Sequence, residues 1–288
     1  MKLNFISLFS GCGGSSMGYT QAGFKSIVAV DINPVACETY SINFPDSNVL
    51  NKDITQINPI DLIKEQNLSV GELDLLDSSP PCQGFSIAGK RDPKDLRNEL
   101  FLYVKYFIEE LKPKTFIIEN VDGLLKGPMK GIFNTIISEL KKTNYRIKWK
   151  SINSIYYGVP QSRQRVIIMG VREDLNLDPV FPEHEPTINF IGDVIKGIDF
   201  HSRGQFDKKL KGVNTFAYTV TKTPSMFFIE NGLKRQPTIE ELKILQGFPE
   251  DFKLVGSFND QWGLIGNSVP PPLSRKIGET IISKILKG

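Results

Sequence analysis

Short apolar runs alternate with helix-like segments over the first two thirds of the chain, and this rhythm limits the fold more than any other feature. Strands are expected over 3–9, 26–30, 49–53, 73–77, 115–118, 145–151 and 165–171. Helices are expected over 15–22, 34–43, 95–111 and 131–142. Repeated strand–helix units of this length predict an α/β fold with a doubly wound, mostly parallel sheet.

Residues able to do chemistry follow the expected strands. Phe9, Asp31, Asp53 and Glu119 stand at the ends of four strands, and Cys82 follows the end of a fifth. The carboxyl ends of parallel strands meet at one edge of the sheet, where ligands of such folds bind. A single site at that edge is therefore expected.

A rigid turn carries the candidate nucleophile. Pro80 and Pro81 fix two backbone φ angles immediately before Cys82. A thiol in a packed core has no need of such a turn, so Cys82 is the candidate nucleophile, whereas Cys12 and Cys37 are expected to be small core residues. Three cysteines at unrelated spacings indicate no disulfide framework and favour the reducing cytoplasm.

The first expected strand leads into a glycine-rich turn with Gly11, Gly13 and Gly14. The turn lacks the Lys-Ser/Thr of a P-loop and the third glycine of a dinucleotide fingerprint. Asp31 could accept hydrogen bonds from a ribose diol, and Asp53 could accept one from an adenine amino group. Together they indicate a cofactor that contains adenosine but needs no phosphate-binding motif, such as S-adenosylmethionine. The alternative for each aspartate is a helix cap.

Two further groups carry charge near the expected edge. Glu119 follows a wholly apolar strand, which suits a proton donor; the alternative is a cap for the next helix. Arg163 and Arg165 are two apart, which places both on one face of a strand, where they suit an anion or a carbonyl-rich partner; the alternative is a solvated surface.

The rhythm changes after about residue 193. Residues 196–235 are polar and basic, with short alternating runs at 216–220 and 226–229, which predicts a small, mostly β lobe. A helix over 238–245 is expected to begin on a Thr238/Glu241 cap, and a final helix to run from 270–272 to about Leu286. The expected division is 1–195 plus 264–288 for the catalytic and cofactor-binding domain, and 196–263 for the small domain.

The charge distribution leaves two readings open. The formal net charge is only +3, but residues 141–172 hold eight basic side chains and no acidic one, and 200–235 hold seven basic and two acidic. Such patches bind polyanions or are merely solvated faces. No apolar run approaches the length needed to span a membrane, and no signal peptide is expected. Neither histidine has neighbours that could act as metal ligands, so no metal site is expected.

Taken together, these residues resemble the ordered motifs of DNA (cytosine-5)-methyltransferases of the prokaryotic restriction–modification type. The matching segments are 9–14, Asp31, Asp53, Pro80-Pro81-Cys82-Gln83, Glu119-Asn120-Val121, Gln161-x-Arg163-x-Arg165, 235–249 and Gly266-Asn267-Ser268-Val269-Pro270. They span nearly the whole chain in the family's order. The resemblance implies a Rossmann-like, S-adenosylmethionine-dependent fold with a small target-recognition lobe.

The resemblance also implies a mechanism. Cys82 would add to carbon 6 of a cytosine flipped out of duplex DNA, Glu119 would protonate ring N3, and Arg165 would bind O2. Arg163 would support the catalytic loop or the thiolate, and Asn120 would orient the Pro-Cys turn. No side chain stands out as the base that removes the carbon 5 proton, and water is an equal candidate.

The remaining contacts come from the resemblance as well. The loop 84–97 would close over the base, with Ser86 near the vacated space and Arg97 near phosphate. Residues in 196–235, such as Arg203 and Lys222, would contact DNA. Phe9 and Ile32 would flank the adenine; the other expected cofactor-binding residues are Gly11, Gly13, Gly14, Asp31, Asp53, Ile54, Pro80, Asn267 and Val269. S-adenosylhomocysteine would be the product. A monomer acting on double-stranded DNA is expected, with no membrane partner, alongside a possible cognate endonuclease that it does not contact.

Departures and alternatives are part of this reading. The recognition region is short for the family, Asp31 stands where Glu is common, and Ile32 replaces an aromatic that many members carry. The alternatives are a tRNA cytosine-5 methyltransferase, although the Cys-Phe-Thr tripeptide of that branch is absent, and a catalytically silent DNA-binding protein. A nicotinamide oxidoreductase fits the strand–helix rhythm but explains neither Cys82 nor the arginines.

Overall fold

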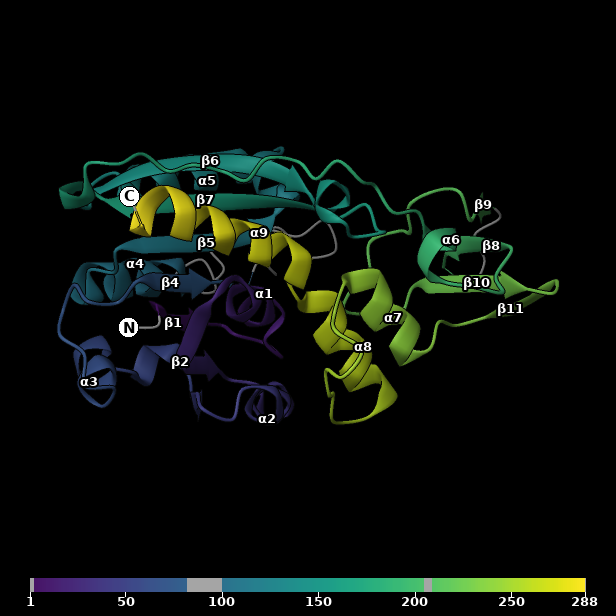
Figure 1. The fold of residues 1–288 in the computed structure, drawn as a ribbon, viewed down its shortest axis with the longest axis horizontal. Helices are drawn as coiled ribbons and strands as arrows, with labels where there is room; N and C mark the ends of the chain where they lie inside the picture. Colours follow the sequence, from purple (N-terminus) through teal and green to yellow (C-terminus); the bar gives the residue numbers. More distant parts are fainter. Residues whose placement is uncertain (1–2, 82–99, 205–208, 288) are drawn as a thin grey trace.

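The computed structural model of the chain describes residues 3–81, 100–204 and 209–287 (Figure 1). A seven-stranded sheet with the strand order β3-β2-β1-β4-β5-β7-β6 forms the larger part. Its strands are β1 (Leu3–Leu8), β2 (Phe24–Asp31), β3 (Asn48–Asn51), β4 (Leu75–Ser78), β5 (Thr115–Val121), β6 (Tyr145–Asn153) and β7 (Gln164–Arg172). Strands β1 to β5 are parallel, and β7 runs antiparallel between β5 and β6. The prediction of a doubly wound, mostly parallel sheet is confirmed.

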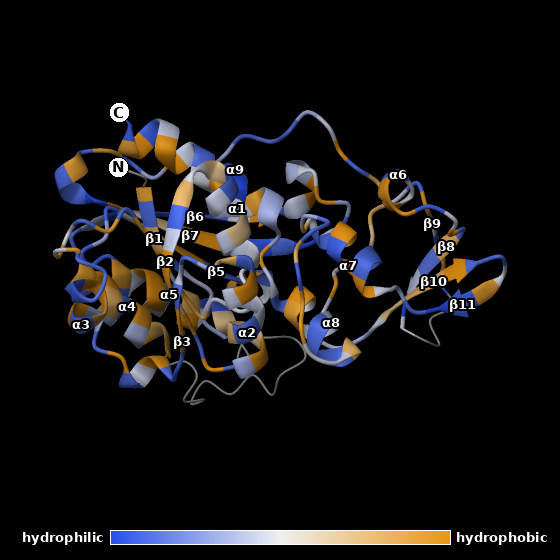
Figure 2. Ribbon diagram, turned by 60° about the horizontal axis from the view of Figure 1, so that its bottom comes forward, coloured by the Kyte–Doolittle hydropathy of each residue, from blue (hydrophilic) through white to orange (hydrophobic). Residues whose placement is uncertain are grey.

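Helices cover both faces of this sheet because side chains alternate along buried parallel strands. Phe5, Leu75 and Ile117 pack with α1 (Gly14–Ala22) and α9 (Pro271–Ile281). Their strand neighbours Ile6, Leu76 and Ile118 pack with α3 (Pro59–Lys64), α4 (Leu100–Leu111) and α5 (Met129–Leu140). Figure 2 shows hydrophobic residues, in orange, along α4 and α5 beside the strands.

The molecule also contains short helices and turns. They are α2 (Pro34–Asn43), α6 (Ile191–Val194), the 3₁₀ turns η1 (Ile54–Gln56), η3 (Asp122–Leu125), η4 (Ser154–Tyr157) and η5 (Glu173–Leu175), and η6 (Ile282–Leu286), a π-helical turn that continues α9. Of the helix expected over 95–111, residues 95–99 lie outside the described part of the chain. Helices α3 and α6, and the later helix α8 (Phe258–Asn267), were not expected from the sequence.

A second, four-stranded antiparallel sheet with the order β11-β10-β8-β9 lies at the far end of the molecule (Figure 1). Its strands are β8 (Phe200–Arg203), β9 (Lys211–Gly212), β10 (Met226–Glu230) and β11 (Leu233–Arg235). The prediction of a small β lobe is confirmed, including the strand over 226–229. The strand expected over 216–220 is wrong: Ala217 forms only an isolated bridge with Gln161, because its backbone pairs with Pro160 and Ser162 beside the larger sheet.

Helices α7 (Ile239–Gln246) and α8 (Phe258–Asn267) lie between the two sheets (Figure 1). The expected cap of α7 is confirmed, because the Thr238 hydroxyl accepts from the Glu241 N–H while the Glu241 carboxylate accepts from the Thr238 N–H. Leu242 of α7 and Trp262 of α8 share one buried cluster with Phe228 of the small sheet. The small sheet is thereby attached to the larger domain through a common core.

Helix α9 lies directly against α1, although the two are distant in the sequence. A Cβ atom on Gly278 of α9 would come within 2.8 Å of the Ala22 Cβ atom, so glycine allows this close approach. Leu273, Ile277 and Ile281 of α9 are fully or almost fully buried. The face of the sheet near β1 is therefore closed by a helix that follows the small lobe in the sequence.

Candidate active site

The register of the parallel strands fixes which residues share the carboxyl edge of the sheet. Leu8 of β1 lies opposite Val30 of β2 and Ser78 of β4, and Ser78 lies opposite Ile118 of β5. The residues that follow them, including Phe9, Asp31 and Glu119, consequently lie along one edge. The expectation that these residues meet at one edge is confirmed for the described strands.

The glycine turn after β1 curls at this edge. Phe9, Gly11 and Gly13 have positive φ angles of 55°, 53° and 93°, a conformation that glycine adopts without strain. The Gly11 N–H donates to the Asp31 carboxylate at 2.8 Å. A Cβ atom on Gly14 would lie 2.6 Å from the Val269 carbonyl oxygen, whereas one on Gly11 would meet no atom within 4 Å. The turn is packed against 268–269 on one side and open above Gly11.

The two aspartates take different local roles. Asp31 accepts backbone N–H groups from Gly11 and Asn33, each at 2.8 Å, while Asn33 itself caps α2. The cap reading is thus wrong for Asp31, and burial raises the pKa of its carboxyl group. Asp53 does cap η1, because it accepts from the Thr55 N–H at 2.9 Å. Asp31 therefore joins β2 to the glycine turn, and Asp53 orders the turn after β3.

A charged pair occupies the end of β5. This strand continues through Glu119 and Asn120 to Val121, further than the expected 115–118. The Glu119 carboxylate forms an ion pair with Arg165 of β7, with 2.9 Å between Oε1 and Nε. Both side chains are largely buried. The Asn120 side-chain amide donates to the Pro80 carbonyl at 3.4 Å, and its oxygen accepts from the Val121 N–H. These contacts bring the acid, the arginine and the Pro-Pro turn together.

Arg163 has a different environment from Arg165. Its side chain is 1% exposed, and its guanidinium donates to the carbonyls of Val220 and Gly266, each at 2.9 Å. It thus connects the start of β7 with the small lobe and with the segment that leads into α9. This buried role is one that spacing in the sequence does not reveal, and the solvated-surface reading is wrong for Arg163.

Replacing Arg163 with methionine should lower the free energy of unfolding by about 2–6 kcal/mol, because two buried carbonyls lose their donors and each costs about 1–3 kcal/mol. Urea unfolding followed by tryptophan fluorescence measures the change. Arg146→Met is the matched control: Arg146 is exposed and pairs with Asp178 at 3.5 Å, so its loss should cost less than about 1 kcal/mol. Equal losses in the two variants would contradict the role assigned to Arg163.

The expected core cysteines are confirmed. Cys12 is 1% exposed and lies 3.1 Å from the Ser268 hydroxyl, and Cys37 is 6% exposed. Burial raises the pKa of Cys12 to about 12 and that of Cys37 to about 11, so neither thiol forms a thiolate readily. Cys82, Ser86 and Arg97 lie outside the described residues, as does the whole loop 84–97. Their expected roles stay predictions.

The structure also places the other expected site residues. Ile54 and Val269 are buried, Ile32 is 68% exposed beside Asp31, and Asn267 is exposed at the end of α8. Pro80 is buried next to Asn120. Arg203 and Lys222 are both exposed in the small lobe. Their roles at the edge, and those of Arg203 and Lys222 in contacting DNA from the small lobe, stay predictions.

One functional candidate was missed in the sequence. Asp77 of β4 is 2% exposed and accepts the hydroxyls of Ser7 at 3.0 Å and Ser15 at 2.6 Å. Burial raises its pKa to about 6. The acidic residue just before the Pro-Pro turn was the available signal, but only the fold shows that it lies beneath the glycine turn.

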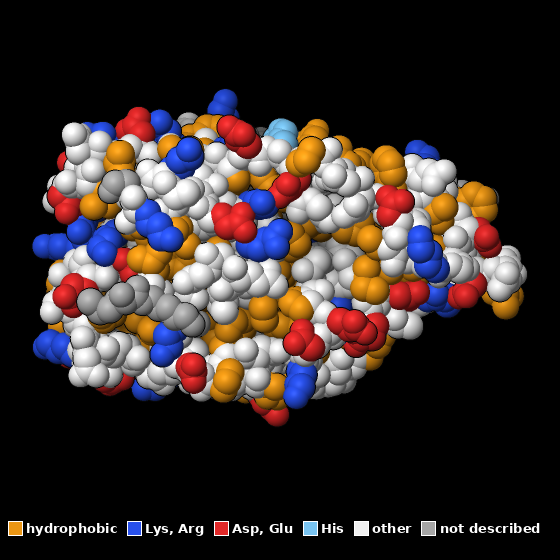
Figure 3. Space-filling view, in the orientation of Figure 1, with side chains coloured by type: hydrophobic (Ala, Val, Ile, Leu, Met, Phe, Trp, Pro, Cys, Tyr) orange, Lys and Arg blue, Asp and Glu red, His pale blue; other side chains and the backbone are white. Residues whose placement is uncertain are grey.

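The basic run over 141–172 is largely compensated by acids outside it. Arg146 and Lys148 pair with Asp178, Lys142 with Glu139, and Arg172 with Asp174. Figure 3 accordingly shows Lys and Arg side chains interspersed with Asp and Glu on one face of the molecule. The run therefore gives little support by itself to a polyanion partner.

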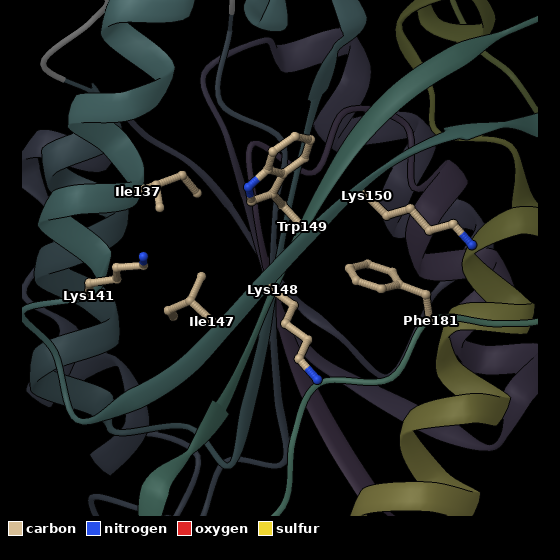
Figure 4. A pocket seen from close by; sticks show the side chains of 7 residues that line it. All are labelled: Ile137, Lys141, Ile147, Lys148, Trp149, Lys150 and Phe181. Atoms are coloured by element: carbon tan, nitrogen blue, oxygen red, sulfur yellow. The ribbon is translucent and has the colours of Figure 1, made fainter.

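A cavity of about 390 Å³ lies away from the carboxyl edge, beside β6 (Figure 4). Its lining residues are Ile137, Lys141, Ile147, Lys148, Trp149, Lys150 and Phe181. None of the residues expected to bind the cofactor or the base lines it. The chemistry at the strand ends, rather than this hollow, identifies the candidate site. Within the described ranges, no cluster of three or more His, Cys, Asp or Glu could hold a metal ion, and no helix is long and apolar enough to cross a membrane.

The edge suits an adenosine cofactor. Gly11 leaves open space above the turn, and Asp31 has acceptor capacity beyond its two backbone bonds. The hydroxyls of Ser10 and Ser78, next to the turn and at the end of β4, are buried without a protein partner among the described residues. The donor set thus fits a ribose and a polar amino acid group.

Comparison with known proteins agrees with this geometry. The profile of the C-5 cytosine-specific DNA methylase family matches residues 3–212 and 199–283. The Type II methyltransferase M1.HphI of Haemophilus parahaemolyticus is 30% identical over 98% of this chain and 87% of its own length. M.DdeI of Desulfomicrobium norvegicum is 41% identical over 61% of this chain, which spans 42% of that relative.

Solved structures share the fold. A crystal structure named as a prophage-encoded DNA modification methyltransferase of E. coli has a TM-score of 0.81 and 25% identity, with 99% of this chain and all of the other covered. A DNMT2 mutant of Spodoptera frugiperda has a TM-score of 0.73 and 24% identity over 99% of this chain and all of its own. The family profile, which matches nearly the whole chain, and the 30% identity to M1.HphI establish that the protein belongs to the C-5 cytosine-specific DNA methylases.

Proposed function

We propose that the carboxyl edge holds S-adenosylmethionine and a flipped cytosine side by side. The protein is a DNA cytosine-5 methyltransferase, as its family membership establishes, and the proposal concerns which residues carry the reaction. It rests above all on the Glu119–Arg165 pair, which lies next to the Asn120–Pro80 contact. The glycine turn joined to Asp31 occupies the neighbouring strands of the same edge.

Cofactor binding falls to the turn and the strand ends. Asp31 would accept from the ribose hydroxyls, and Asp53 from the adenine amino group with its uncommitted oxygen. Phe9 would pack against the adenine on one side and Ile32, which is well exposed, on the other. Gly11, Gly13, Gly14, Ile54, Pro80, Asn267 and Val269 would shape the remaining wall. When bound, S-adenosylmethionine supplies an electrophilic methyl group.

The residues of the edge divide the work on the base. The Cys82 thiolate would form a bond to carbon 6 of cytosine, while Glu119 places a proton on N3, so that carbon 5 becomes nucleophilic. Arg165 would hold O2 and orient Glu119, and Asn120 would fix the turn that presents Cys82. After methylation, water would take the carbon 5 proton as the carbon 6–sulfur bond breaks and Cys82 leaves as the thiolate, and the N3 proton would return to Glu119.

DNA recognition is assigned to the small lobe and to the loop 84–97. Arg203 and Lys222 are exposed in the region 196–235, which Arg163 ties to the larger domain through Val220. Ser86 and Arg97 would contribute contacts to the opened duplex. We further propose a monomer in the cytoplasm, within a restriction–modification system whose endonuclease it does not contact.

The test of this function is methyl incorporation from labelled S-adenosylmethionine into duplex genomic DNA and, separately, into bulk tRNA. Bisulfite sequencing of the DNA product then reports the methylated positions. The expected result is methylated cytosines within one short sequence motif of DNA. Label in tRNA alone would contradict the DNA substrate, and label in neither would contradict the assignment of an active enzyme.

A further inference from the structure

Asp77 is a buried carboxylate that the reaction scheme leaves without a role. It is 2% exposed and accepts the hydroxyl groups of Ser7 of β1 and Ser15 of α1. Within the described residues, no Lys or Arg side chain forms an ion pair with it. A buried charge is costly unless it is well hydrogen-bonded, so a carboxylate retained here calls for an explanation.

The position of Asp77 suggests one. Ser7 lies opposite Asp77 in the sheet, two residues before Phe9, and Ser15 directly follows Gly14. The carboxylate thus lies beneath both ends of the glycine turn. The first turn of α1 contains no acidic residue, and its N-cap, Gly13, offers no side-chain acceptor. Asp77 is therefore the anion that the N-terminus of α1 favours.

The charge state of Asp77 follows from its surroundings. Burial raises its pKa to about 6, and the hydroxyls of Ser15, Ser7 and Tyr19 limit the rise, whereas Glu119 adds to it. The neighbouring Tyr19 has a pKa well above its usual value because it is buried, so it stays neutral. At pH 8 the floor of the glycine turn consequently carries one negative charge.

We propose that Asp77 determines the preference of this site for the cationic cofactor over the neutral product. The inference rests on the proposed binding of S-adenosylmethionine at the glycine turn. S-adenosylmethionine and S-adenosylhomocysteine differ by one methyl group and by the positive charge on sulfur. A fixed anion beneath the turn attracts the first and not the second, which favours loading of the methyl donor and release of the spent product.

The two ligands separate this role from a merely structural one. If Asp77 only held β1, β4 and α1 together, its replacement would lower the affinity for both ligands by the same factor. A charge effect weakens binding of S-adenosylmethionine and leaves that of S-adenosylhomocysteine unchanged, so it changes the ratio of their dissociation constants. For charges on the order of 10 to 15 Å apart and an effective dielectric of about 20, the ratio should change roughly six- to fifteenfold.

The experiment is isothermal titration of the full-length protein with each ligand at pH 8. In Asp77→Asn, the affinity for S-adenosylmethionine should fall roughly six- to fifteenfold relative to that for S-adenosylhomocysteine. Asparagine is close to isosteric and can still accept from one hydroxyl and donate to another. Asp77→Ser, a second neutral variant, should shift the ratio in the same way and guards against misfolding of the first.

Asp74→Asn is the matched control. Asp74 is also buried and immediately precedes β4, but it lies at the opposite end of the strand, where it pairs with Lys114 at 2.7 Å. This variant should keep the wild-type ratio. An unchanged ratio in both Asp77 variants would overturn the inference while leaving the proposed function intact. Failure of the wild type to bind either ligand would overturn the proposed cofactor site and the inference with it.

Discussion

Replacing Cys82 with serine should abolish methyl transfer, with a loss of roughly 10⁴-fold or more, while binding of duplex DNA is retained. A serine hydroxyl remains protonated at neutral pH and does not add to carbon 6 of cytosine at a useful rate. The Pro80–Asn120 contact that fixes the preceding turn does not involve the thiol, so the substitution should leave the site assembled. Labelled methyl incorporation and electrophoretic mobility shift measure the two properties separately.

Cys37→Ser provides the control for this experiment. Cys37 is buried beside β2, and its thiol donates to the Asp31 carbonyl at 3.3 Å, a bond that a serine hydroxyl can keep. This variant should retain methyl transfer. Substantial turnover by Cys82→Ser would refute the assignment of the nucleophile, whatever its effect on DNA binding.

Replacing Glu119 with glutamine should lower kcat by roughly 10²–10⁴-fold, the usual contribution of a positioned proton donor. The amide can still accept from Arg165, so the packing at the end of β5 should change little. The expected loss is thus in proton transfer to N3 rather than in folding. Single-turnover methylation rates, with thermal unfolding measured alongside, distinguish these two effects.

Asp122 lies close to Glu119 in the chain and allows a stringent control. It immediately follows β5, pairs with Lys126 at 2.5 Å and accepts from the Ser151 hydroxyl at 2.6 Å. Asp122→Asn should therefore leave the single-turnover rate near that of the wild type. If both variants lost activity to the same extent, the negative charge in this region, and not the proton of Glu119, would be the relevant property.

The sequence allowed prediction of those parts of the site that depend on local pattern. The strand ends near Phe9 and Asp31 were predictable because apolar runs and turns define parallel strands, and their carboxyl ends share an edge. Glu119 lies near the same edge, although β5 continues past it to Val121. The Thr238 cap was predictable because both partners lie within one helical turn. The ordered motifs then indicated the family.

The rest depends on contacts between distant segments. Arg163 donates to carbonyls 57 and 103 residues away, and Asp77 accepts from Ser15, 62 residues earlier. No local pattern encodes such partners. The run 216–220 has the alternation of a strand, but Ala217 pairs with Pro160 and Ser162 instead of joining the small sheet. The basic run over 141–172 looked uncompensated because its partner Asp178 lies just beyond it.

The packing of α9 on α1 bears on how the protein is made. The ribosome synthesises β1, α1 and the small lobe before α9. Phe5, Tyr19 and Phe24, however, are buried in a cluster that includes side chains of α9. A nascent chain therefore carries an uncovered apolar surface until α9 emerges, and such surfaces invite aggregation or chaperone binding. Because the glycine turn leads directly into α1, the proposed cofactor site should be complete only after α9 has packed onto α1. An unfinished chain should therefore not methylate DNA.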